Sequence, residues 1–88
     1  LGASLIGLGA FTSVVGDGGV TVRSRSPIGV TTGNSYTVAT AIEGTLDACA
    51  KVGVHLPDAT LAVVGATGSI GKTCARVLSR SFGRTILV

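Results

Sequence analysis

The stretch Leu61-Ala62-Val63-Val64-Gly65-Ala66-Thr67-Gly68-Ser69-Ile70-Gly71 decides the fold of this 88-residue chain. It opens with a continuous apolar run of strand length, which is typical of a strand covered on both faces of a parallel sheet. A helical stripe of apolar residues follows the glycines, and we expect Gly83 to end that helix. The members of the stripe are Ile70, Cys74, Val77, Leu78 and Phe82. Because the apolar run Thr85–Val88 then starts another strand, residues 60–88 are predicted to form one strand–helix–strand unit.

Three glycines at three-residue spacing occupy the turn between the expected strand and helix. Gly65 allows a sharp turn, Gly68 has no Cβ and lets a pyrophosphate approach the backbone, and Gly71 lets the helix pack closely on the strand. The free N–H groups and the dipole of the helix start favour a phosphate. Thr67 and Ser69 add hydroxyl donors. The turn therefore predicts a dinucleotide site made by Gly65, Ala66, Thr67, Gly68, Ser69, Ile70 and Gly71.

A phosphate loop is the alternative interpretation of the same residues. Residues 66–73 fit G-x-x-x-x-G-K-[ST] with alanine in the first glycine position, so that Lys72 would reach the β- and γ-phosphates and Thr73 would hold Mg²⁺. The lost first glycine and the unexplained glycine triplet argue against a nucleotide triphosphatase. In a dinucleotide-binding domain, the residue that decides whether NAD or NADP is bound normally lies about 20 residues after the turn. That position falls at or beyond the end of this sequence.

A long amphipathic helix is expected before this unit. The cluster Thr31–Ser35 holds residues that cap helix starts, and Gly53 suits the left-handed position after the last turn. The stripe between them has helical spacing and consists of Val38, Ala41, Ile42, Thr45, Leu46, Cys49 and Val52, with Glu43, Asp47 and Lys51 on the other side. This pattern indicates a helix of about five turns.

The first thirty residues read as short elements joined by strong turns. Residues 4–9 fit a buried strand or the turn after one, and residues 11–15 fit a short helix. The run Gly16–Gly19 has turn chemistry, because glycine accepts positive φ and aspartate caps turns. Val20-Thr21-Val22 alternates into Arg23 as a short strand, and residues 28–30 are another strand candidate.

The composition is unusual for a self-sufficient small domain. Hydrophobic residues make up 45% and charged residues 12% of the chain, and the mean hydropathy is +0.64, whereas soluble domains carry about 25% charged residues. A short chain has the most surface for its volume and should be more polar, not less. We therefore expect a fragment of a larger enzyme, without an initiator Met, whose remainder or another copy covers its apolar faces.

Composition and spacing also exclude several functions. The net charge is +3 and the cations are scattered, while aromatic residues make up 3% of the chain, so we expect no nucleic-acid partner. The apolar stretch 1–16 is shorter than the roughly 20 residues of a membrane helix. Cys49 and Cys74 fall on apolar helix faces, which indicates reduced thiols in a cytoplasmic protein. His55 is expected to be a solvated loop residue, and no metal-ligand spacing is present.

Three segments together resemble the cyanobacterial-type long-chain fatty acyl-carrier-protein reductases, which make fatty aldehydes. They are "LGAFTSVV" at 8–15, "TTGNSYT" at 31–37 and "ATLAVVGATGSIG" at 59–71, and the helix exit "KVGVHLPDA" at 51–59 is also similar. The resemblance implies an NADPH-dependent reductase that takes an acyl group from a thioester on a cysteine and releases aldehyde. It places that cysteine downstream of this chain, so neither Cys49 nor Cys74 matches it.

The resemblance also implies further site residues and partners. It places the loop that holds Thr32, Gly33 and Asn34 at the cleft, near the nicotinamide or the acyl group. It gives Phe11, Thr12 and Ser13 a cleft-facing role. Simple structural interpretations exist beside this one: residues 9–13 can be a strand-to-helix turn, and Thr32 or Asn34 can cap the long helix. The expected cofactor is NADPH with NADH as the alternative, and the expected partners are an acyl thioester and an acyl carrier protein.

The sequence therefore predicts an α/β chain, a fragment of a Rossmann-type doubly wound parallel sheet preceded by a long connecting helix. Residues 1–33 are assigned to a substrate or interdomain segment, 34–58 to the long helix and its exit loop, and 59–88 to the first βαβ unit of the NAD(P)-binding domain. The expected function is NAD(P)H-dependent reduction of a fatty acyl thioester. The alternatives are a shikimate dehydrogenase-like reductase of a small polar substrate and a non-catalytic nucleotide-binding or oligomerising module.

Overall fold

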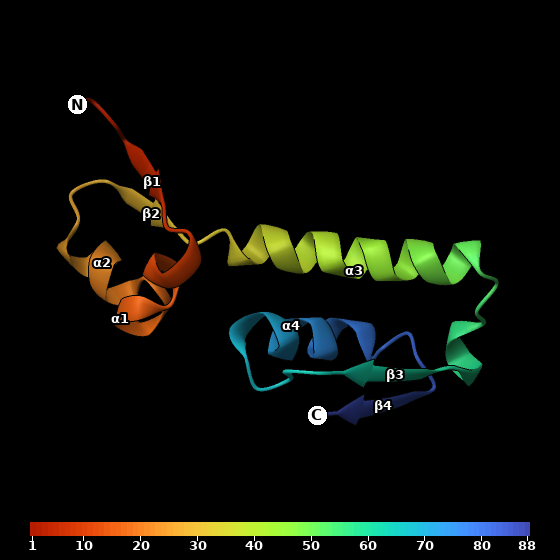
Figure 1. The fold of residues 1–88 in the computed structure, drawn as a ribbon. Helices are drawn as coiled ribbons and strands as arrows, with labels where there is room; N and C mark the ends of the chain where they lie inside the picture. Colours follow the sequence, from red (N-terminus) through yellow and green to blue (C-terminus); the bar gives the residue numbers. More distant parts are fainter. The chain divides into compact units, whose positions relative to one another are not determined.

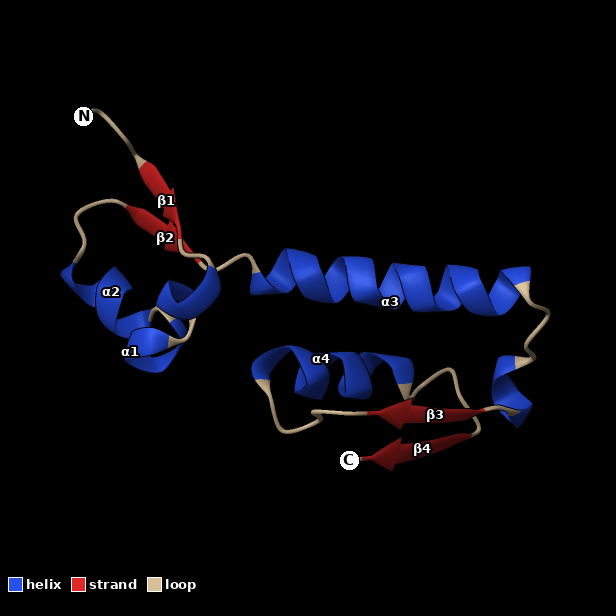
Figure 2. Cartoon of the chain, in the orientation of Figure 1, coloured by secondary structure: helices blue, strands red, loops and turns tan.

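The computed structural model describes residues 1–88, with the side chain of Val15 excepted. Two compact units divide the chain, Leu1–Gly33 and Asn34–Val88. Each unit contains one two-stranded parallel sheet with helices along the connection between its strands, as Figure 1 and Figure 2 show. The chain is therefore an α/β protein, as expected.

The first unit is built on the parallel strands β1 (Leu5–Gly7) and β2 (Gly29–Thr31). A 3₁₀ helix at Ala10–Ser13 follows β1, and then come the short helices α1 (Val15–Gly18) and α2 (Val20–Arg25). Parallel strands need such a crossover, because the chain must return to the starting end of the sheet before the second strand begins.

The prediction of a strand at Val20–Arg23 is wrong, because these residues belong to α2. Gly19 adopts a left-handed conformation with φ 91° and turns the chain into the helix, and the Arg23 N–H donates to the Gly19 carbonyl at 2.9 Å. The strand preference of Val-Thr-Val is weak and depends on context. The crossover between β1 and β2 overrides it.

The turn expected at residues 16–19 is present, since Gly16, Asp17, Gly18 and Gly19 all have positive φ. Before it, the helix expected at residues 11–15 is a 3₁₀ helix one residue earlier, at Ala10–Ser13.

The second unit contains α3 (Asn34–Lys51), a 3₁₀ turn at Leu56–Asp58, β3 (Thr60–Val63), α4 (Ser69–Leu78) and β4 (Arg84–Leu87). Strands β3 and β4 pair in parallel, with Leu61 opposite Thr85 and Val63 opposite Leu87. The order strand, glycine turn, helix and strand is the one predicted for residues 60–88.

The end of α3 follows the predicted design. Gly53 has φ +74°, its N–H donates to the Ala50 carbonyl at 3.2 Å, and the Val54 N–H donates to the Cys49 carbonyl at 2.9 Å. These two bonds form a Schellman motif that satisfies the last carbonyls of the helix. On the solvent side, the Lys51 ammonium pairs with the Asp47 carboxylate at 2.7 Å.

A small core lies where α3, α4 and β3 meet. Its buried side chains are Leu61, Cys74, Ala75 and Leu78. Three partly buried residues at helical spacing on α3, namely Val38, Ile42 and Leu46, pack against this cluster, as do Val63, Ile70 and Phe82. Cys49 and Cys74 are free thiols. The core fixes α4 against β3 and therefore fixes the turn that joins them.

The predicted end of the second helix at Gly83 is wrong. Helix α4 ends at Leu78, and Gly83 instead allows a close approach: its N–H donates to the Leu56 carbonyl at 3.1 Å, and an added Cβ would lie 2.9 Å from the Pro57 carbonyl carbon. Phe82 lies beyond the helix yet still packs on the core. Within the described residues, none of the helices combines the length and the apolar character needed to cross a membrane.

Candidate functional site

The turn between β3 and α4 begins with Gly65 in the left-handed region, at φ +77°. The Gly65 and Ala66 N–H groups both donate to the Val88 carbonyl, at 2.9 and 3.2 Å. A residue with a Cβ is strained at this φ. The first glycine therefore serves the sharp turn expected of it, and the two hydrogen bonds hold the turn at the end of β4.

The third glycine, Gly71, sits where α4 passes closest to the turn. A Cβ on Gly71 would lie 2.9 Å from the Gly65 carbonyl carbon and 3.3 Å from the Ala66 Cα, and closer still to the Gly65 carbonyl oxygen. No other residue type fits without moving α4. The close helix packing predicted for this position has therefore a direct steric cause.

The fold constrains the middle glycine, Gly68, less than the other two. It is the N-cap residue of α4, with ordinary extended φ and ψ of −71° and 160°, and a Cβ there would lie 3.3 Å from the Gly65 oxygen. Its N–H donates to the Gly65 carbonyl at 3.0 Å, and its carbonyl accepts from the Lys72 N–H at 2.8 Å. A Cβ at Gly68 would therefore need the Gly65 oxygen to move by a few tenths of an ångström, a smaller shift than a Cβ at Gly71 would need.

The start of α4 is a candidate anion site. No side chain caps it, and the first N–H groups of a helix, here those of Ser69, Ile70 and Gly71, have no acceptor within the helix. These donors and the positive end of the helix dipole attract a phosphate or carboxylate. Thr67 and Ser69 are exposed beside them.

A contact that the sequence did not reveal joins this helix start to α3. The Asn34 side-chain amide donates to the Ser69 hydroxyl at 3.3 Å. Asn34 is the first residue of α3, and the resemblance placed it in a cleft. The structure brings Asn34 to Ser69 across 35 positions of sequence that contain no local signal for the contact, and its place in a cleft remains a prediction.

The phosphate-loop interpretation is at odds with this geometry. Lys72 is already the fourth residue of α4, and the Thr73 hydroxyl donates to the Ser69 carbonyl of its own helix at 3.0 Å. The turn before the helix is closed by the short Gly68-to-Gly65 hydrogen bond and does not form a wide loop around a phosphate. Thr73 is therefore not placed as a metal ligand.

The other predicted site residues lie at the end of the first unit and in its 3₁₀ helix. Phe11 is 87% exposed, and the Thr12 and Ser13 hydroxyls donate to the carbonyls of Gly9 and Ala10, at 2.6 and 2.7 Å. Thr32 and Gly33 close the unit, with Gly33 at φ +73°. These residues remain predicted site residues.

A hollow of the second unit, about 410 Å³ in volume, is lined by Cys49 and His55 among mainly apolar residues. His55 Nδ1 lies 2.8 Å from a carboxylate oxygen of Asp58, with both side chains exposed. Among the described residues, no group of three or more histidine, cysteine, aspartate or glutamate side chains is placed to hold a metal ion.

Comparison with known proteins shows similarity to a part of a larger protein. No family model and no solved structure matches the chain. The chain is 36% identical over 77 residues to "Aminotransferase PigE" of Serratia sp. (strain ATCC 39006), a match that covers 88% of this chain and 9% of that protein. The chain is thus similar to a small segment of that enzyme. Most of the enzyme, to which its name refers, lies outside the matched segment.

Proposed function

We propose that the second unit is the first βαβ unit of a dinucleotide-binding domain in an NAD(P)H-dependent reductase. One observation carries this proposal, namely the geometry of the glycine turn. Strand β3 leads through the left-handed Gly65 into the start of α4, which no side chain caps, and Gly71 in the first turn of α4 has no room for a Cβ. This is the combination by which such domains bring a pyrophosphate to a helix N-terminus. Strands β3 and β4 would be the first two strands of a Rossmann-type doubly wound sheet.

The residues present fit the pyrophosphate of a dinucleotide. The N–H groups of Ser69, Ile70 and Gly71 would donate to its oxygens, and the Thr67 and Ser69 hydroxyls would add donors. Gly68 would leave room for the phosphate at the backbone, and Ala66 would lie beside it. When bound, NAD(P)H supplies the hydride for the reduction.

The proposed substrate is a fatty acyl thioester, with reduction to the aldehyde in the cytoplasm. Its support is the resemblance of residues 8–15, 31–37 and 59–71 to fatty acyl-carrier-protein reductases. On this proposal the cofactor is NADPH, the acyl carrier protein delivers the substrate, and Phe11–Ser13 and Thr32–Asn34 belong to the cleft. The cysteine that takes the acyl group would lie outside this chain.

The relative's name suggests a second candidate, part of an aminotransferase. Such enzymes hold pyridoxal phosphate as a Schiff base on a lysine. The lysines of this chain do not fit that role, because Lys51 is exposed and pairs with Asp47 and Lys72 is an exposed residue of α4. Pyridoxal phosphate bound to a lysine of this chain, detected by borohydride reduction and mass spectrometry, would favour the aminotransferase.

A titration tests the cofactor proposal. We expect the protein, as its gene encodes it, to bind NADPH or NADH and not to require ATP with Mg²⁺, and to form aldehyde from a long-chain acyl thioester and NADPH. Binding of ATP with Mg²⁺ but of neither nicotinamide nucleotide would refute the dinucleotide proposal. Reduction of a small polar ketone instead of the thioester would favour a shikimate dehydrogenase-like enzyme, and binding without turnover of either would favour a non-catalytic module.

A paired substitution makes this test specific to the turn. Gly68→Ala should keep the fold, because the position has extended φ and ψ and the Gly65 oxygen, 3.3 Å from the new Cβ, needs to move by only a few tenths of an ångström. It should weaken cofactor binding about tenfold or more by filling the space of the pyrophosphate. Gly44→Ala, whose Cβ meets nothing within 4 Å on α3, is the matched control. Equal cofactor affinity of both variants would mean that the phosphate lies elsewhere.

A further inference from the structure

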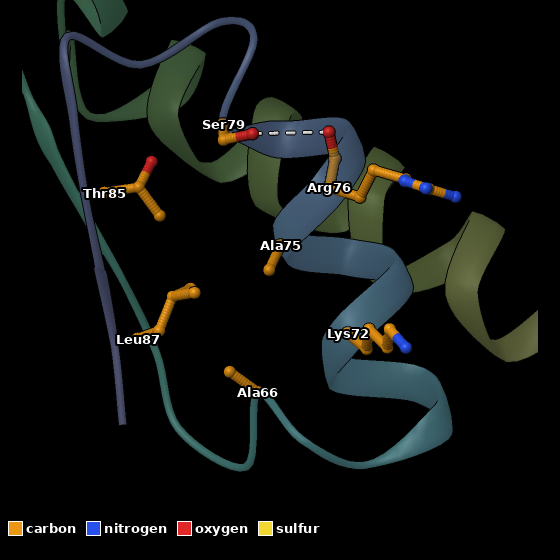
Figure 3. A pocket seen from close by; sticks show the side chains of 7 residues that line it. All are labelled: Ala66, Lys72, Ala75, Arg76, Ser79, Thr85 and Leu87. Atoms are coloured by element: carbon orange, nitrogen blue, oxygen red, sulfur yellow. Dashed lines mark hydrogen bonds between the residues drawn. The ribbon is translucent and has the colours of Figure 1, made fainter.

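Helix α4 carries cations along its outer side. Lys72 and Arg76 are four residues apart on the helix, and Arg80 follows after four more residues. All three residues are exposed. Figure 3 looks onto the hollow between α4 and β4, and it shows the charged ends of Lys72 and Arg76 extending away from β4 along the outer side of the helix. We call Lys72, Arg76 and Arg80 the cationic row.

The chain keeps turning in a helical sense beyond the last residue of α4. The Ser79 N–H donates to the Ala75 carbonyl at 3.0 Å, and the Arg80 N–H donates to the Val77 carbonyl at 3.3 Å. The Ser79 hydroxyl also donates to the Arg76 carbonyl at 3.3 Å, the dashed line in Figure 3. Because residues four apart are neighbours on a helix surface, Arg80 extends the row by one more turn.

The cationic row has no acidic residues beside it in the sequence. Residues 59–88 contain four lysines and arginines and no aspartate or glutamate. In the part of the chain that the structure describes, the ion pairs join Lys51 to Asp47 and His55 to Asp58, so none of them reaches the row. Helix α3, in contrast, carries both signs of charge and pairs Lys51 with Asp47 one turn apart.

Helix stability does not explain this row. Like charges one turn apart repel each other and destabilise a helix. The helix dipole favours cations near the end of α4, where Arg76 lies, but it disfavours Lys72, the fourth residue of the helix. An exposed row of one sign, with no compensating carboxylates, is complementary to a surface of the opposite sign on a partner.

We propose that the cationic row is a docking surface for an acidic protein, one with a helix whose carboxylates are spaced one turn apart. The inference rests on the proposed function and deepens it, because the acyl carrier protein that would deliver the thioester is a small acidic protein. Ammonium and guanidinium groups form charge-assisted hydrogen bonds to carboxylates. Nucleic acid fits this surface less well, since the one aromatic residue of 59–88, Phe82, packs on the core and offers no base-stacking platform.

A binding titration with purified acyl carrier protein tests the inference on the protein as its gene encodes it. We expect Lys72→Gln, Arg76→Gln and Arg80→Gln together to weaken binding about tenfold or more. The affinity of the unaltered protein should fall as salt is added, because exposed charges are screened beyond about 8 Å at physiological ionic strength.

The matched control removes the same net charge from other exposed positions. It combines Arg23→Gln, Arg25→Gln and Arg84→Gln, three exposed arginines outside the cationic row. This variant should keep the affinity for the carrier protein, since a loss caused by net charge alone would be equal in both triple variants. Circular dichroism of both variants checks that the helices are retained.

A kinetic comparison separates docking from chemistry. The same acyl group is offered on the acyl carrier protein or on N-acetylcysteamine, a small neutral thiol. Neutralising the cationic row should raise KM about tenfold for the carrier-protein substrate, with kcat unchanged, and should leave both constants unchanged for the neutral thioester.

The outcomes separate this inference from the proposed function. Loss of carrier-protein binding in the row variant, with the control variant unchanged, supports the docking surface. An equal loss in both variants, or no loss in the row variant, overturns it. Binding of DNA or of phosphatidylglycerol vesicles through the row, without binding of the carrier protein, also overturns it. If the carrier protein binds through the row but the unaltered protein reduces no thioester, the proposed function fails and the docking surface stands.

Discussion

Replacement of Gly71 by alanine should loosen the whole second unit. The new methyl carbon would lie 2.9 Å from the Gly65 carbonyl carbon, whereas non-bonded carbons prefer about 3.5–4.0 Å. Helix α4 must therefore shift by roughly 0.6 Å or more, the difference between these contacts. Overpacking of this kind costs about 1–3 kcal/mol, and the better helix propensity of alanine returns up to about 1 kcal/mol. We expect the free energy of unfolding to fall by about 1–2 kcal/mol.

The thiol of Cys74 reports this change directly, because its side chain is 8% exposed in the core under α4. In a Cys49→Ser background, the rate at which Cys74 reacts with a thiol reagent measures how often α4 opens, and mass spectrometry of its peptide isolates that signal. A loss of 1–2 kcal/mol should raise the rate roughly 5- to 30-fold.

Gly44→Ala supplies the control of opposite sign. Gly44 lies inside α3 with nothing within 4 Å of an added Cβ, so alanine should stabilise the helix by about 0.5–1 kcal/mol. In Gly44→Ala the labelling rate at Cys74 should fall or stay constant. The same result in Gly71→Ala would refute the steric account of the third glycine. It would mean that α4 does not pack on the turn as closely as described.

Three further substitutions test the scaffold by urea unfolding. Leu78→Ala removes a core side chain that is 5% exposed and should cost about 2–3 kcal/mol, at the low end for leucine because the core is shallow; a loss under 1 kcal/mol would contradict its core position. Gly53→Ala forces alanine to φ +74° and should cost about 1–2 kcal/mol, whereas no change would argue against the Schellman motif. Asp47→Asn breaks an exposed ion pair with Lys51 and should cost about 0.3–0.5 kcal/mol, a difference that disappears in 1 M salt.

The elements that could be predicted are those whose signals are local and repeated. The stripe on residues 38–52 places α3 and its left-handed Gly53, because seven residues repeat the same helical spacing. The apolar run before Gly65 places β3, and the glycine triplet places the start of α4. In each of these cases the propensity, the hydrophobic pattern and the cap residues agree.

The elements that could not be predicted depend on long-range contacts. Val20-Thr21-Val22 carries a strand pattern, and only the parallel pairing of β1 with β2 requires a helix there. The position of Gly83 in the sequence is typical of a helix end. The reason for a glycine there is instead steric, because a Cβ would clash with the carbonyl group of Pro57. The contact of Asn34 with Ser69 joins two helix starts that are adjacent only after α3 has packed on α4.

The glycine triplet separates the requirements of folding from those of a ligand. Gly65 and Gly71 are explained by the fold, the first by its positive φ and the second by a steric limit. Gly68 is not, because it has ordinary φ and ψ and occupies the N-cap of α4, where serine, aspartate or asparagine stabilises a helix better than glycine. Helix stability alone would therefore favour one of those residues at this position. A glycine that leaves the helix start uncapped, with its N–H groups open, is what a bound phosphate would require. Of the three glycines, Gly68 is accordingly the one where the proposed function can be tested with the smallest disturbance of the fold.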